Sequence, residues 1–495
     1  MLGIFMHLLR IQVPDFRILR GVDITFESEF VPTVFPLGSQ NGGGKSTLLQ
    51  LIFVLLRCSS ESNKKVFLNN MLYGFKINKD SNQKVLAIID IQHNNKTIQL
   101  EFSCNRDSYL KDILNSNDKG ETNDDEYLSF SASTKLESVK YKIAQIEKEI
   151  RTLEKIITRL RTFKGIQNIN DRRDQIVKLM EDLNKELYFK FVSMGDVSIQ
   201  SIERIQEDLQ ATLDVFNLNL NKFSEERKGL ERILQKVIKY FQSKNLIYIC
   251  NYSANANEVE EEVLLCHINN IDMTEVEGFL KELSQKVFLA APNSQVFLFL
   301  SQESRKLLFR DQNSGNDYYS QLEDAKSEIT GFFTYDFLAI DLLIESFKAA
   351  RDRDFKEAIE TGNYGNSYQT LIRDLNMILN NKKINVDTNL SGVTFKLDKN
   401  GENIELYPED LSHGELKRLS IYMWIRYYNI ENAIVLMDEI EIAFHPDWQY
   451  QVIADLKQWS PTNQYILATH SYELCQAVTP AHVKELEPKL LKQEP

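Results

Sequence analysis

Hydrophobic positions alternate in short bursts near the start of the chain. Three bursts lie between residues 8 and 35, in the segments LLRIQV, FRILRGVDITF and VPTVF, and predict three short strands. After a glycine-rich loop, Leu48–Leu56 is an apolar run without Gly or Pro, which predicts a buried helix. Residues Lys84–Phe102 form two strand-like runs around a polar HNNK turn and predict a β-hairpin. The polar, acidic segment Asn115–Glu126 predicts a loop.

The hydrophobic period changes after residue 130. Apolar residues recur there at alternating spacings of three and four, at Leu136, Val139, Ile143, Ile146, Ile150, Leu153, Ile157 and Leu160. This spacing is the a/d seam of a coiled coil. The pattern breaks at Lys164–Asn170, resumes loosely as far as Leu187, and is followed by a second stripe over residues 202–237. We predict an antiparallel helical hairpin; an ordinary helical subdomain is the alternative, but a strict a/d seam is narrower than a core-facing stripe.

Strand-like and helical patterns mix in the rest of the chain. The runs LIYICNY, EVLLCHI and QVFLFLS predict strands, and MTEVEGFLKELSQKVF predicts a helix between the last two. Helical patterns follow around Phe333–Glu360 and Ser367–Lys382, and an Asn400–Gly401 turn predicts a hairpin over residues 392–406.

Four regions follow from these changes of pattern. We predict an N-terminal lobe over residues 1–130, a coiled-coil or helical insertion over 131–245, a mixed α/β and helical region over 246–390, and a C-terminal lobe over 391–495.

Composition and net charge argue against several classes of protein. A chain of 495 residues with 43% hydrophobic and 26% charged residues is ordinary for a soluble globular protein of two to four units. No apolar run approaches the ~18 residues that span a bilayer, so we expect no membrane segment. The five cysteines form no CxxC pair, which argues against zinc and disulfides and favours the cytoplasm. The net charge of −13 argues against a general nucleic-acid coat protein.

The glycine-rich loop SQNGGGKST is the first segment with recognisable chemistry. Small residues let successive backbone N–H groups point inward around phosphates. We expect Lys45 to reach the β and γ phosphates and Ser46 to bind Mg²⁺. A strict pattern would have Gly in place of Ser39, but Ser removes no ligand. The predicted nucleotide-binding residues of this loop are Ser39, Asn41, Gly42, Gly43, Gly44, Lys45, Ser46 and Thr47.

A second segment, AIVLMDE at residues 433–439, is an apolar run that ends in two carboxylates. A buried parallel strand that carries acids at its C-terminal end is where α/β nucleotide sites place metal ligands. We expect Asp438 to hold Mg²⁺ through water and Glu439 to polarise the attacking water.

Two further segments complete the set. LSHGE opens a long helical pattern, so that Ser412 and Gly414 stand at a helix start, where N–H groups bind anions. A capping box without a ligand is the alternative interpretation. YILATHS is another apolar strand, and it delivers His470 where it could sense a γ-phosphate.

Together these segments, in this order, resemble the ABC-type ATPase heads of the SMC, RecF and OLD-like proteins. The resemblance covers residues 1–102 and 393–478 and implies an α/β P-loop ATPase head split in sequence by an inserted coiled-coil hairpin and a further helical region. LSHGE looks like the signature motif that contacts the γ-phosphate on the opposing subunit, with His413 where Gly or Ser is usual. EIEIAFHP is similar to the segment after the Walker B strand, Glu441 matches its second acid, and His470 matches the switch histidine. Gln92 lies where the Q-loop glutamine, a metal ligand, is expected.

The resemblance implies an ATPase with ATP and Mg²⁺ at composite sites between two heads of a homodimer or a higher homo-oligomer. Our leading hypothesis is a sensor or regulator in a prokaryotic anti-phage system, similar to the ATPases of the Septu, PARIS and retron-associated kinds. Few residues follow His470, so we expect the effector, a nuclease, to be a separate chain. The alternative is a RecF-like or SMC-like DNA-repair ATPase that binds DNA directly. Contact with DNA or RNA is open in both hypotheses, and a transporter ATPase is disfavoured by the long insertion.

Overall fold

The computed structural model divides the chain into two compact units. One unit comprises Met1–Asp107 and Phe241–Pro495, and the other comprises Ser108–Tyr240. The described residues are 6–40, 42–60, 65–78, 80–94, 96–106, 131–163, 199–252, 262–300, 305, 326–335, 339–379, 381–399 and 402–486. The predicted loop at 115–126 therefore lies outside the described residues.

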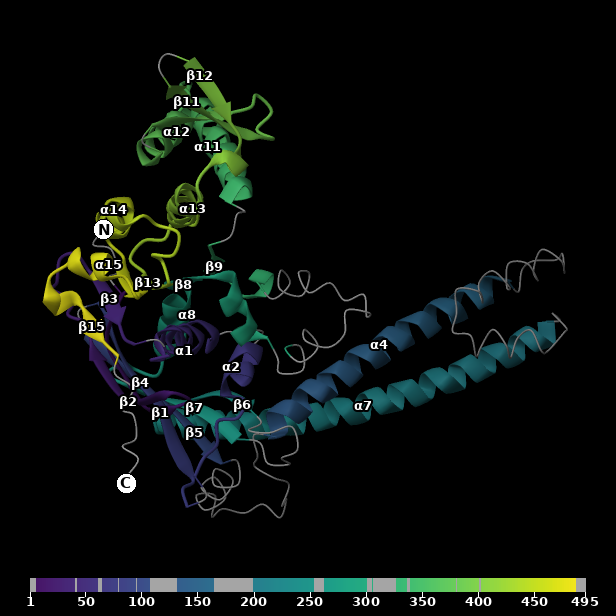
Figure 1. Ribbon diagram of the computed structural model, residues 1–495. Coiled ribbons are helices and arrows are strands. Elements are labelled where there is room, and N and C mark those ends of the chain that lie inside the picture. Colours follow the sequence, from purple (N-terminus) through teal and green to yellow (C-terminus); the bar gives the residue numbers. More distant parts are fainter. Residues whose placement is uncertain are drawn as a thin grey trace. The chain divides into compact units, whose positions relative to one another are not determined.

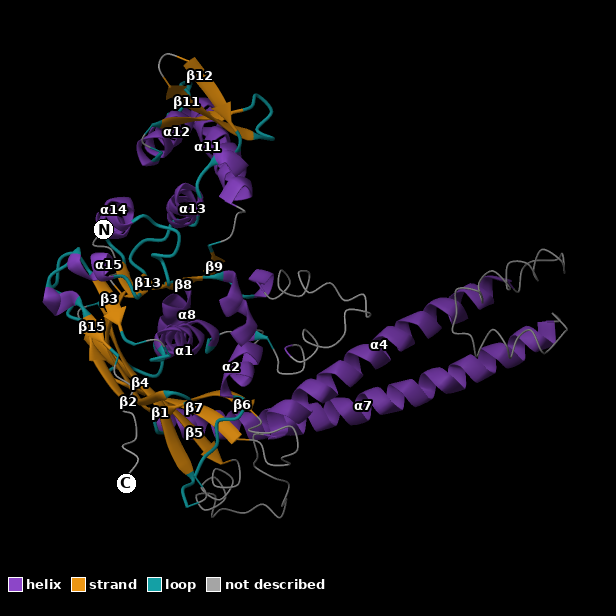
Figure 2. Cartoon of the chain, viewed as in Figure 1, coloured by secondary structure: helices purple, strands orange, loops and turns teal. Residues whose placement is uncertain are grey.

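A six-stranded antiparallel sheet, in the order β2-β1-β4-β5-β7-β6, forms one layer of the first unit (Figure 2). Its strands are β1 (Met6–Phe16), β2 (Leu19–Thr25), β4 (Gln83–His93), β5 (Lys96–Arg106), β6 (Leu246–Tyr252) and β7 (Glu262–Asn269). The predicted hairpin is confirmed, since His93 of β4 pairs with Lys96 of β5. Strands β6 and β7, which follow the second unit in sequence, extend the sheet from the free side of β5.

A six-stranded parallel sheet, in the order β15-β3-β14-β13-β8-β9, forms the second layer. Its strands are β3 (Val34–Gly38), β8 (Val287–Ala291), β9 (Phe332–Thr334), β13 (Ile434–Asp438), β14 (Gln464–Ala468) and β15 (Lys484–Glu485). Every pair is parallel. The carboxyl ends of β3, β13 and β14 therefore meet at one edge, where α/β folds place ligands.

The parallel sheet separates two hydrophobic cores. Ile434 and Leu436 of β13 pack into the core that holds α1 (Lys45–Cys58), α2 (Lys65–Leu72) and α8 (Val276–Gln285), while Val435 and Met437 face the other core. The second core holds α13 (His413–Tyr427) and α14 (Pro446–Trp459). Side chains alternate along a strand, so a strand buried on both faces reads as one apolar run. This explains why AIVLMDE carried no alternation.

Smaller elements complete the first unit. Helices α11 (Ala339–Thr361) and α12 (Ser367–Ile378) accompany a three-stranded antiparallel sheet of β10 (Lys382–Val386), β11 (Val393–Lys399) and β12 (Glu402–Leu406) (Figure 1). The hairpin predicted over 392–406 is confirmed as β11 and β12, with Asn400 and Gly401 outside the described residues. The short helices are α15 (Tyr472–Gln476), η2 (Asn293–Phe299), η3 (Pro408–Asp410) and η4 (Pro480–His482).

The second unit contains the long helix α4 (Ser131–Phe163) and most of α7 (Ile199–Ser243). On α4 the predicted seam is buried at Leu136, Val139, Ile143, Ile150, Leu153 and Ile157. Nζ of Lys142 on α4 lies 5.4 Å from the ring centroid of Phe223 near the middle of α7, so the two helices pack side by side. The break at 164–170, the stripe to Leu187 and the SMGDVS turn lie outside the described residues.

Three predictions of secondary structure were wrong. The helical patterns around Phe333–Glu360 and Ser367–Lys382 each overlap a strand at one end, since Phe333 lies in β9 and Lys382 begins β10. QVFLFLS does not form a strand: Asn293–Phe299 is the 3₁₀ helix η2, and Phe299 packs against Phe53 and Phe332. The predicted helix through Phe288 ends at Gln285, and Val287 begins strand β8. A short apolar run fits a buried strand and a buried helix equally well, so its period could not separate them.

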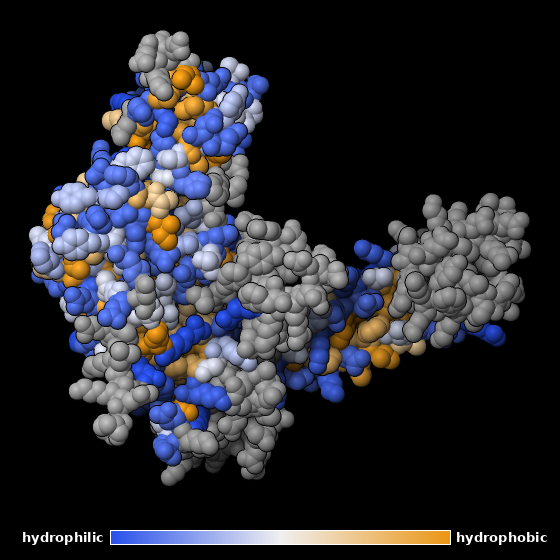
Figure 3. Space-filling view, viewed as in Figure 1, coloured by the Kyte–Doolittle hydropathy of each residue, from blue (hydrophilic) through white to orange (hydrophobic). Residues whose placement is uncertain are grey.

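Among the described residues, no helix combines the length and apolar character that a membrane span requires. The face seen in Figure 3 is largely hydrophilic, with hydrophobic residues scattered over it.

Candidate functional site

The loop between β3 and α1 is fixed by three consecutive glycines. Gly42 and Gly44 have φ angles of 76° and 90°, which residues with a side chain rarely adopt. A Cβ atom on Gly43 would lie 2.3 Å from Oγ of Ser39, so no side chain fits there while Ser39 keeps its position. The serine that replaces the expected glycine is thus accommodated by the glycine it packs against. Asn41 lies outside the described residues.

Lys45 begins α1, and its ammonium group lies against this loop. Nζ donates to the Ser39 carbonyl at 3.2 Å and lies 3.1 Å from Ser39 Oγ and 3.0 Å from Nε2 of His470. Burial lowers the pKa of Lys45, while nearby carboxylates, led by Asp438, oppose that shift. The ammonium group is therefore held between the loop and the acids at the end of β13.

Asp438, the last residue of β13, presents a buried carboxylate. Its side chain is 2% exposed, and within the described part of the chain neither carboxylate oxygen has a hydrogen bond. Burial raises the pKa of Asp438 to about 6, although the nearby Ser46 hydroxyl works in the opposite direction. Unpartnered carboxylate oxygens beside a hydroxyl are hard oxygen donors of the kind Mg²⁺ prefers, so these two residues fit a magnesium ion.

Glu439 follows Asp438 in a left-handed backbone conformation, with φ of 51°. Its N–H donates to the Ala468 carbonyl at 2.9 Å, which ties it to the end of β14. A non-glycine residue in this conformation is uncommon and persists where surrounding contacts fix it. The turn directs the chain out of the sheet directly after the second acid.

Glu441 connects this turn to His470. Its Oε1 accepts the His470 backbone N–H at 2.7 Å, and the side chain is only 8% exposed. The N–H of Thr469 donates to the Leu37 carbonyl at 3.2 Å, which anchors the same segment to β3. The ends of β3, β13 and β14 are thus joined by hydrogen bonds around one point.

A cavity of about 390 Å³ lies at this point. Its lining residues are Ile18, Gly42, Gly43, Gly44, Lys45, Ser46, Thr47, Asp438, Glu439 and His470. The N-terminus of α1 opens onto the same loop, and a helix N-terminus favours anions. The structure brings together the predicted residues from Gly42 to Thr47, both carboxylates and the histidine, while Ser39 does not line the cavity and contacts Lys45. The arrangement suits a phosphate chain with a divalent cation.

Ser412 and Gly414 do not line this cavity. Ser412 caps α13 in a capping box: its Oγ accepts the Glu415 N–H at 3.3 Å, and its own N–H donates to Glu415 at 2.9 Å. The Ser412 side chain is exposed. A Cβ atom on Gly414 would lie 2.7 Å from the Ala443 carbonyl oxygen, so glycine is required for packing. In the single chain, Ser412 therefore acts as a helix cap. Its predicted contact with a second subunit stays a prediction.

Gln92 also lies away from the cavity. It is part of β4 in the antiparallel sheet, paired with His7 on β1 and Thr97 on β5. The structure does not bring it to Asp438 or Ser46, so its role as a metal ligand stays a prediction without geometric support.

No sequence pattern pointed to Ile18 as a residue of the site. It lies in the turn between β1 and β2, lines the cavity, and its Cγ2 would be 2.8 Å from a Cβ on Gly44. An apolar residue within an apolar segment has no pattern that marks it. Glu441 was marked only by the family resemblance.

Comparisons with known proteins agree with this geometry. The family model for the AAA ATPase domain matches residues 6–475. The chain is 28% identical over 224 residues to the retron Vc95 probable ATPase of Vibrio cholerae serotype O1 biovar El Tor, covering 37% of this chain and 42% of that protein. It is 33% identical over 93 residues to the retron Ec83 probable ATPase of Escherichia coli, covering 17% of each. The matches therefore span less than half the length of these relatives.

Among solved structures, the chain is similar to the Smc head domain with an extended coiled coil from Pyrococcus furiosus. The identity is 11% with a TM-score of 0.29, over 96% of this chain and 92% of that one.

Proposed function

The chain belongs to the AAA ATPase domain family, and we propose that it hydrolyses ATP with Mg²⁺ at the cavity where β3, β13 and β14 end. The observation that carries the proposal is the junction of Lys45, Asp438, Glu439 and His470 around one space, although they come from distant parts of the sequence. Each of these residue types has a use in phosphoryl transfer, which depends chiefly on positioning and electrostatic stabilisation.

Each residue of the site has its own role in the proposed reaction. The glycine loop and the N-terminus of α1 bind the phosphates, and Lys45 offsets the charge that develops on the γ-phosphate. Asp438 and Ser46 would hold Mg²⁺, which when bound would offset the negative charge of the phosphates. Glu439, fixed by its left-handed turn, orients the attacking water. His470 lies 3.0 Å from Nζ of Lys45, so it would contact the same phosphate.

We further propose that two heads share each ATP, with Ser412 of one subunit completing the site of the other. Ser412 is exposed at the start of α13 and lies outside the cavity of its own chain, as a residue that serves a neighbour would. A helix N-terminus attracts anions through its partial positive charge, and Ser412 stands at the N-terminus of α13.

Mixing two inactive variants tests the shared site. Lys45→Met disables the loop side and Ser412→Arg the opposing side, so in a mixed dimer one of the two sites regains every native residue. We expect each variant alone to be inactive and the mixture to recover ATP hydrolysis. The matched control mixes Lys45→Met with Asp438→Asn, which damage the same half of the site and cannot complement each other. Recovery in neither mixture, with wild-type activity intact, would refute the shared site.

For the biological role we propose a regulator in a prokaryotic anti-phage system that acts with a separate effector, a nuclease. The similarity to two retron probable ATPases supports this role. Glu439→Gln should bind ATP without hydrolysing it and hold the ATP-bound complex. We therefore expect a stoichiometric nuclease to co-purify with Glu439→Gln from the native operon, and more weakly with Lys45→Met.

Recovery of DNA alone in that experiment would contradict the anti-phage role. It would favour the second candidate, a repair ATPase that binds DNA directly, for which the paired helices α4 and α7 are the supporting observation. ATP-dependent DNA binding by the purified chain that weakens steeply with salt would point the same way.

A further inference from the structure

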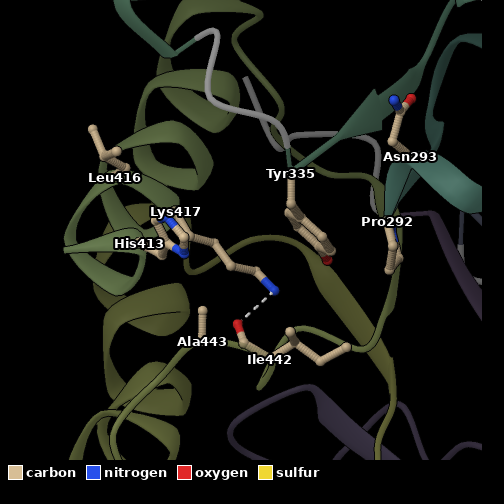
Figure 4. A pocket seen from close by; sticks show the side chains of 8 residues that line it. All are labelled: Pro292, Asn293, Tyr335, His413, Leu416, Lys417, Ile442 and Ala443. Atoms are coloured by element: carbon tan, nitrogen blue, oxygen red, sulfur yellow. Dashed lines mark hydrogen bonds between the residues drawn. The ribbon is translucent and has the colours of Figure 1, made fainter. Parts of the chain in front are cut away.

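Lys417 places a buried ammonium group beside the loop that follows β13. Its side chain extends from α13 and is 5% exposed. Nζ donates to the carbonyl of Glu439 at 3.0 Å and to the carbonyl of Ile442 at 3.1 Å, the second of which is drawn in Figure 4. A charge-assisted hydrogen bond is about twice as strong as a neutral one, so two of them restrain this loop firmly.

Aromatic rings enclose the same ammonium group. Nζ lies 4.0 Å from the ring centroid of Tyr335 and 5.5 Å from that of Phe444. The Tyr335 hydroxyl donates to the Ala290 carbonyl at 3.2 Å, which fixes the ring at the end of β8. Burial lowers the pKa of Lys417 to about 7, an effect that the carboxylates of the neighbouring loop partly offset. A cation buried away from water needs compensating contacts, which the two carbonyls and the two aromatic rings provide here.

The two peptide groups that flank Glu439 are therefore both tied. On one side its N–H donates to Ala468 of β14, and on the other its carbonyl accepts from Lys417 of α13. The left-handed φ of 51° lies between these two restraints. Fixing both peptide planes fixes the direction in which the Glu439 side chain leaves the backbone.

Helix α13 also presses on this loop at its first turn. The close approach of Gly414 to the Ala443 carbonyl leaves no room for a Cβ atom. Lys417 and Gly414 lie on successive turns of one face, since residues three apart are neighbours on a helix. The first two turns of α13 therefore contact the segment 439–443 at both Gly414 and Lys417.

We propose that Lys417 is a positioning residue for ATP hydrolysis, which holds Glu439 in its left-handed turn and couples it to the start of α13. This inference rests on the proposed function, since it takes Glu439 as the residue that orients water. Lys417 is absent from the lining of the nucleotide cavity, so it acts through Glu439 and not on ATP. Ser412 stands at the start of the same helix. A second subunit that contacts Ser412 would therefore affect the position of Glu439 through α13.

Lys417→Met is the first test, because Met keeps the length of the stem and packs well against aromatic rings but cannot donate to the two carbonyls. We expect kcat to fall by about 10- to 100-fold, as for loss of two charge-assisted hydrogen bonds, while KM for ATP changes by less than about 3-fold. Lys417→Arg should recover much of kcat, because a guanidinium can donate to both carbonyls. A cavity of about 230 Å³ beside Lys417 gives the longer side chain room (Figure 4).

The matched control is Lys286→Met. Nζ of Lys286 also donates to a backbone carbonyl, that of Glu431 at 2.8 Å, but on an exposed surface outside the cavity lining. We expect wild-type kcat and KM for this variant. Glu439→Gln combined with Lys417→Met should lose no more rate than Glu439→Gln alone, because both changes disable the same step.

The outcomes separate this inference from the proposed function. If the wild-type protein hydrolyses no ATP, the proposed function fails. If the wild-type protein is active and Lys417→Met keeps its kcat, or loses ATP affinity in place of kcat, the positioning role alone is refuted. Should Lys417→Met not fold, Lys417→Gln decides, because Gln has a shorter and uncharged donor: lowered kcat with native KM supports the role, and unchanged kcat overturns it.

Discussion

The ammonium nitrogen of Lys45 lies 3.0 Å from Nε2 and 3.5 Å from Nδ1 of His470, although the two residues are 425 positions apart in the sequence. They meet because β3 and β14 are adjacent parallel strands whose carboxyl ends lie side by side. The contact places the cation of the loop and the histidine at one end of the cavity.

Replacement of these two residues should therefore affect different steps. Lys45→Met should weaken ATP binding by about 10- to 100-fold, as expected for a lost charge-assisted hydrogen bond. His470→Ala should leave binding nearly intact and lower kcat by roughly 100-fold, the scale for losing one transition-state contact. Calorimetric titration with ATP and steady-state kinetics separate the two effects. Equal loss of binding in both variants would contradict this division.

The buried carboxylate of Asp438 should make the free energy of unfolding depend on pH when nucleotide and Mg²⁺ are absent. Its folded pKa of about 6 is above the ordinary value of 3.8, so the folded protein holds the proton more tightly than the unfolded chain. The charged form therefore destabilises the fold above pH 6, and this cost disappears as the pH falls toward 4. At about 1.4 kcal/mol per pKa unit, Asp438→Asn should stabilise the protein by roughly 1 to 3 kcal/mol at pH 7.5 and by much less at pH 4.5.

Urea unfolding of both proteins at the two pH values, without Mg²⁺, measures this difference. The same variant should have no Mg²⁺-dependent ATP hydrolysis. If Asp438→Asn is less stable than the wild type at pH 7.5, the burial cost assigned to Asp438 is wrong.

Gly414→Ala should destabilise the first unit, because the added Cβ would lie 2.7 Å from a backbone oxygen of Ala443. Overpacking of this kind costs about 1 to 3 kcal/mol. The matched control is Gly278→Ala on α8, where nothing lies within 4 Å and the position is exposed. There the change should stabilise the helix by up to about 1 kcal/mol. Thermal unfolding midpoints should move in opposite directions for the two variants.

Arg418 and Asp455 form a buried ion pair that joins α13 to α14. The guanidinium donates to both carboxylate oxygens, at 2.7 and 2.8 Å, with each side chain less than a tenth exposed. Removal of one partner leaves a buried charge, so Arg418→Met should cost about 3 to 5 kcal/mol. Arg418→Met combined with Asp455→Leu should recover most of that loss, as measured by urea unfolding. A double variant as unstable as the single one would mean that packing, and not charge, holds these helices together.

The glycine loop, the β13 acids and the a/d seam were predictable because local chemistry determines each of them. A loop that needs positive φ requires glycine, and a strand buried on both faces requires a continuous apolar run. Strand β8 was not predictable in this way. Its residues VFLAA continue a helical segment without a break, and pairing with β13 and β9 makes them a strand.

The places of Lys417 and Ile18 in or beside the site could not be predicted from the sequence for a related reason. Lys417 has the same pattern as any lysine in a helix, and its burial arises because Tyr335 and the loop after β13 converge on it. Tyr335 comes from a region with no recognisable motif. A contact between distant segments leaves no pattern in the local sequence, whereas a glycine loop or the end of a buried strand does.

The interleaving of distant strands in the parallel sheet also has a consequence for synthesis. Thr33, next to β3, bonds to the carbonyl of Asn463 across 430 positions of sequence. At a translation rate of about 5 to 20 residues per second, β3 waits roughly 20 to 90 s on the ribosome before β14 exists to pair with it. During that interval β3 and the apolar helix α1 lack the strands β13 and β14 that complete their packing. Nascent chains of this protein are thus expected to depend on chaperones until residues near 470 have been made.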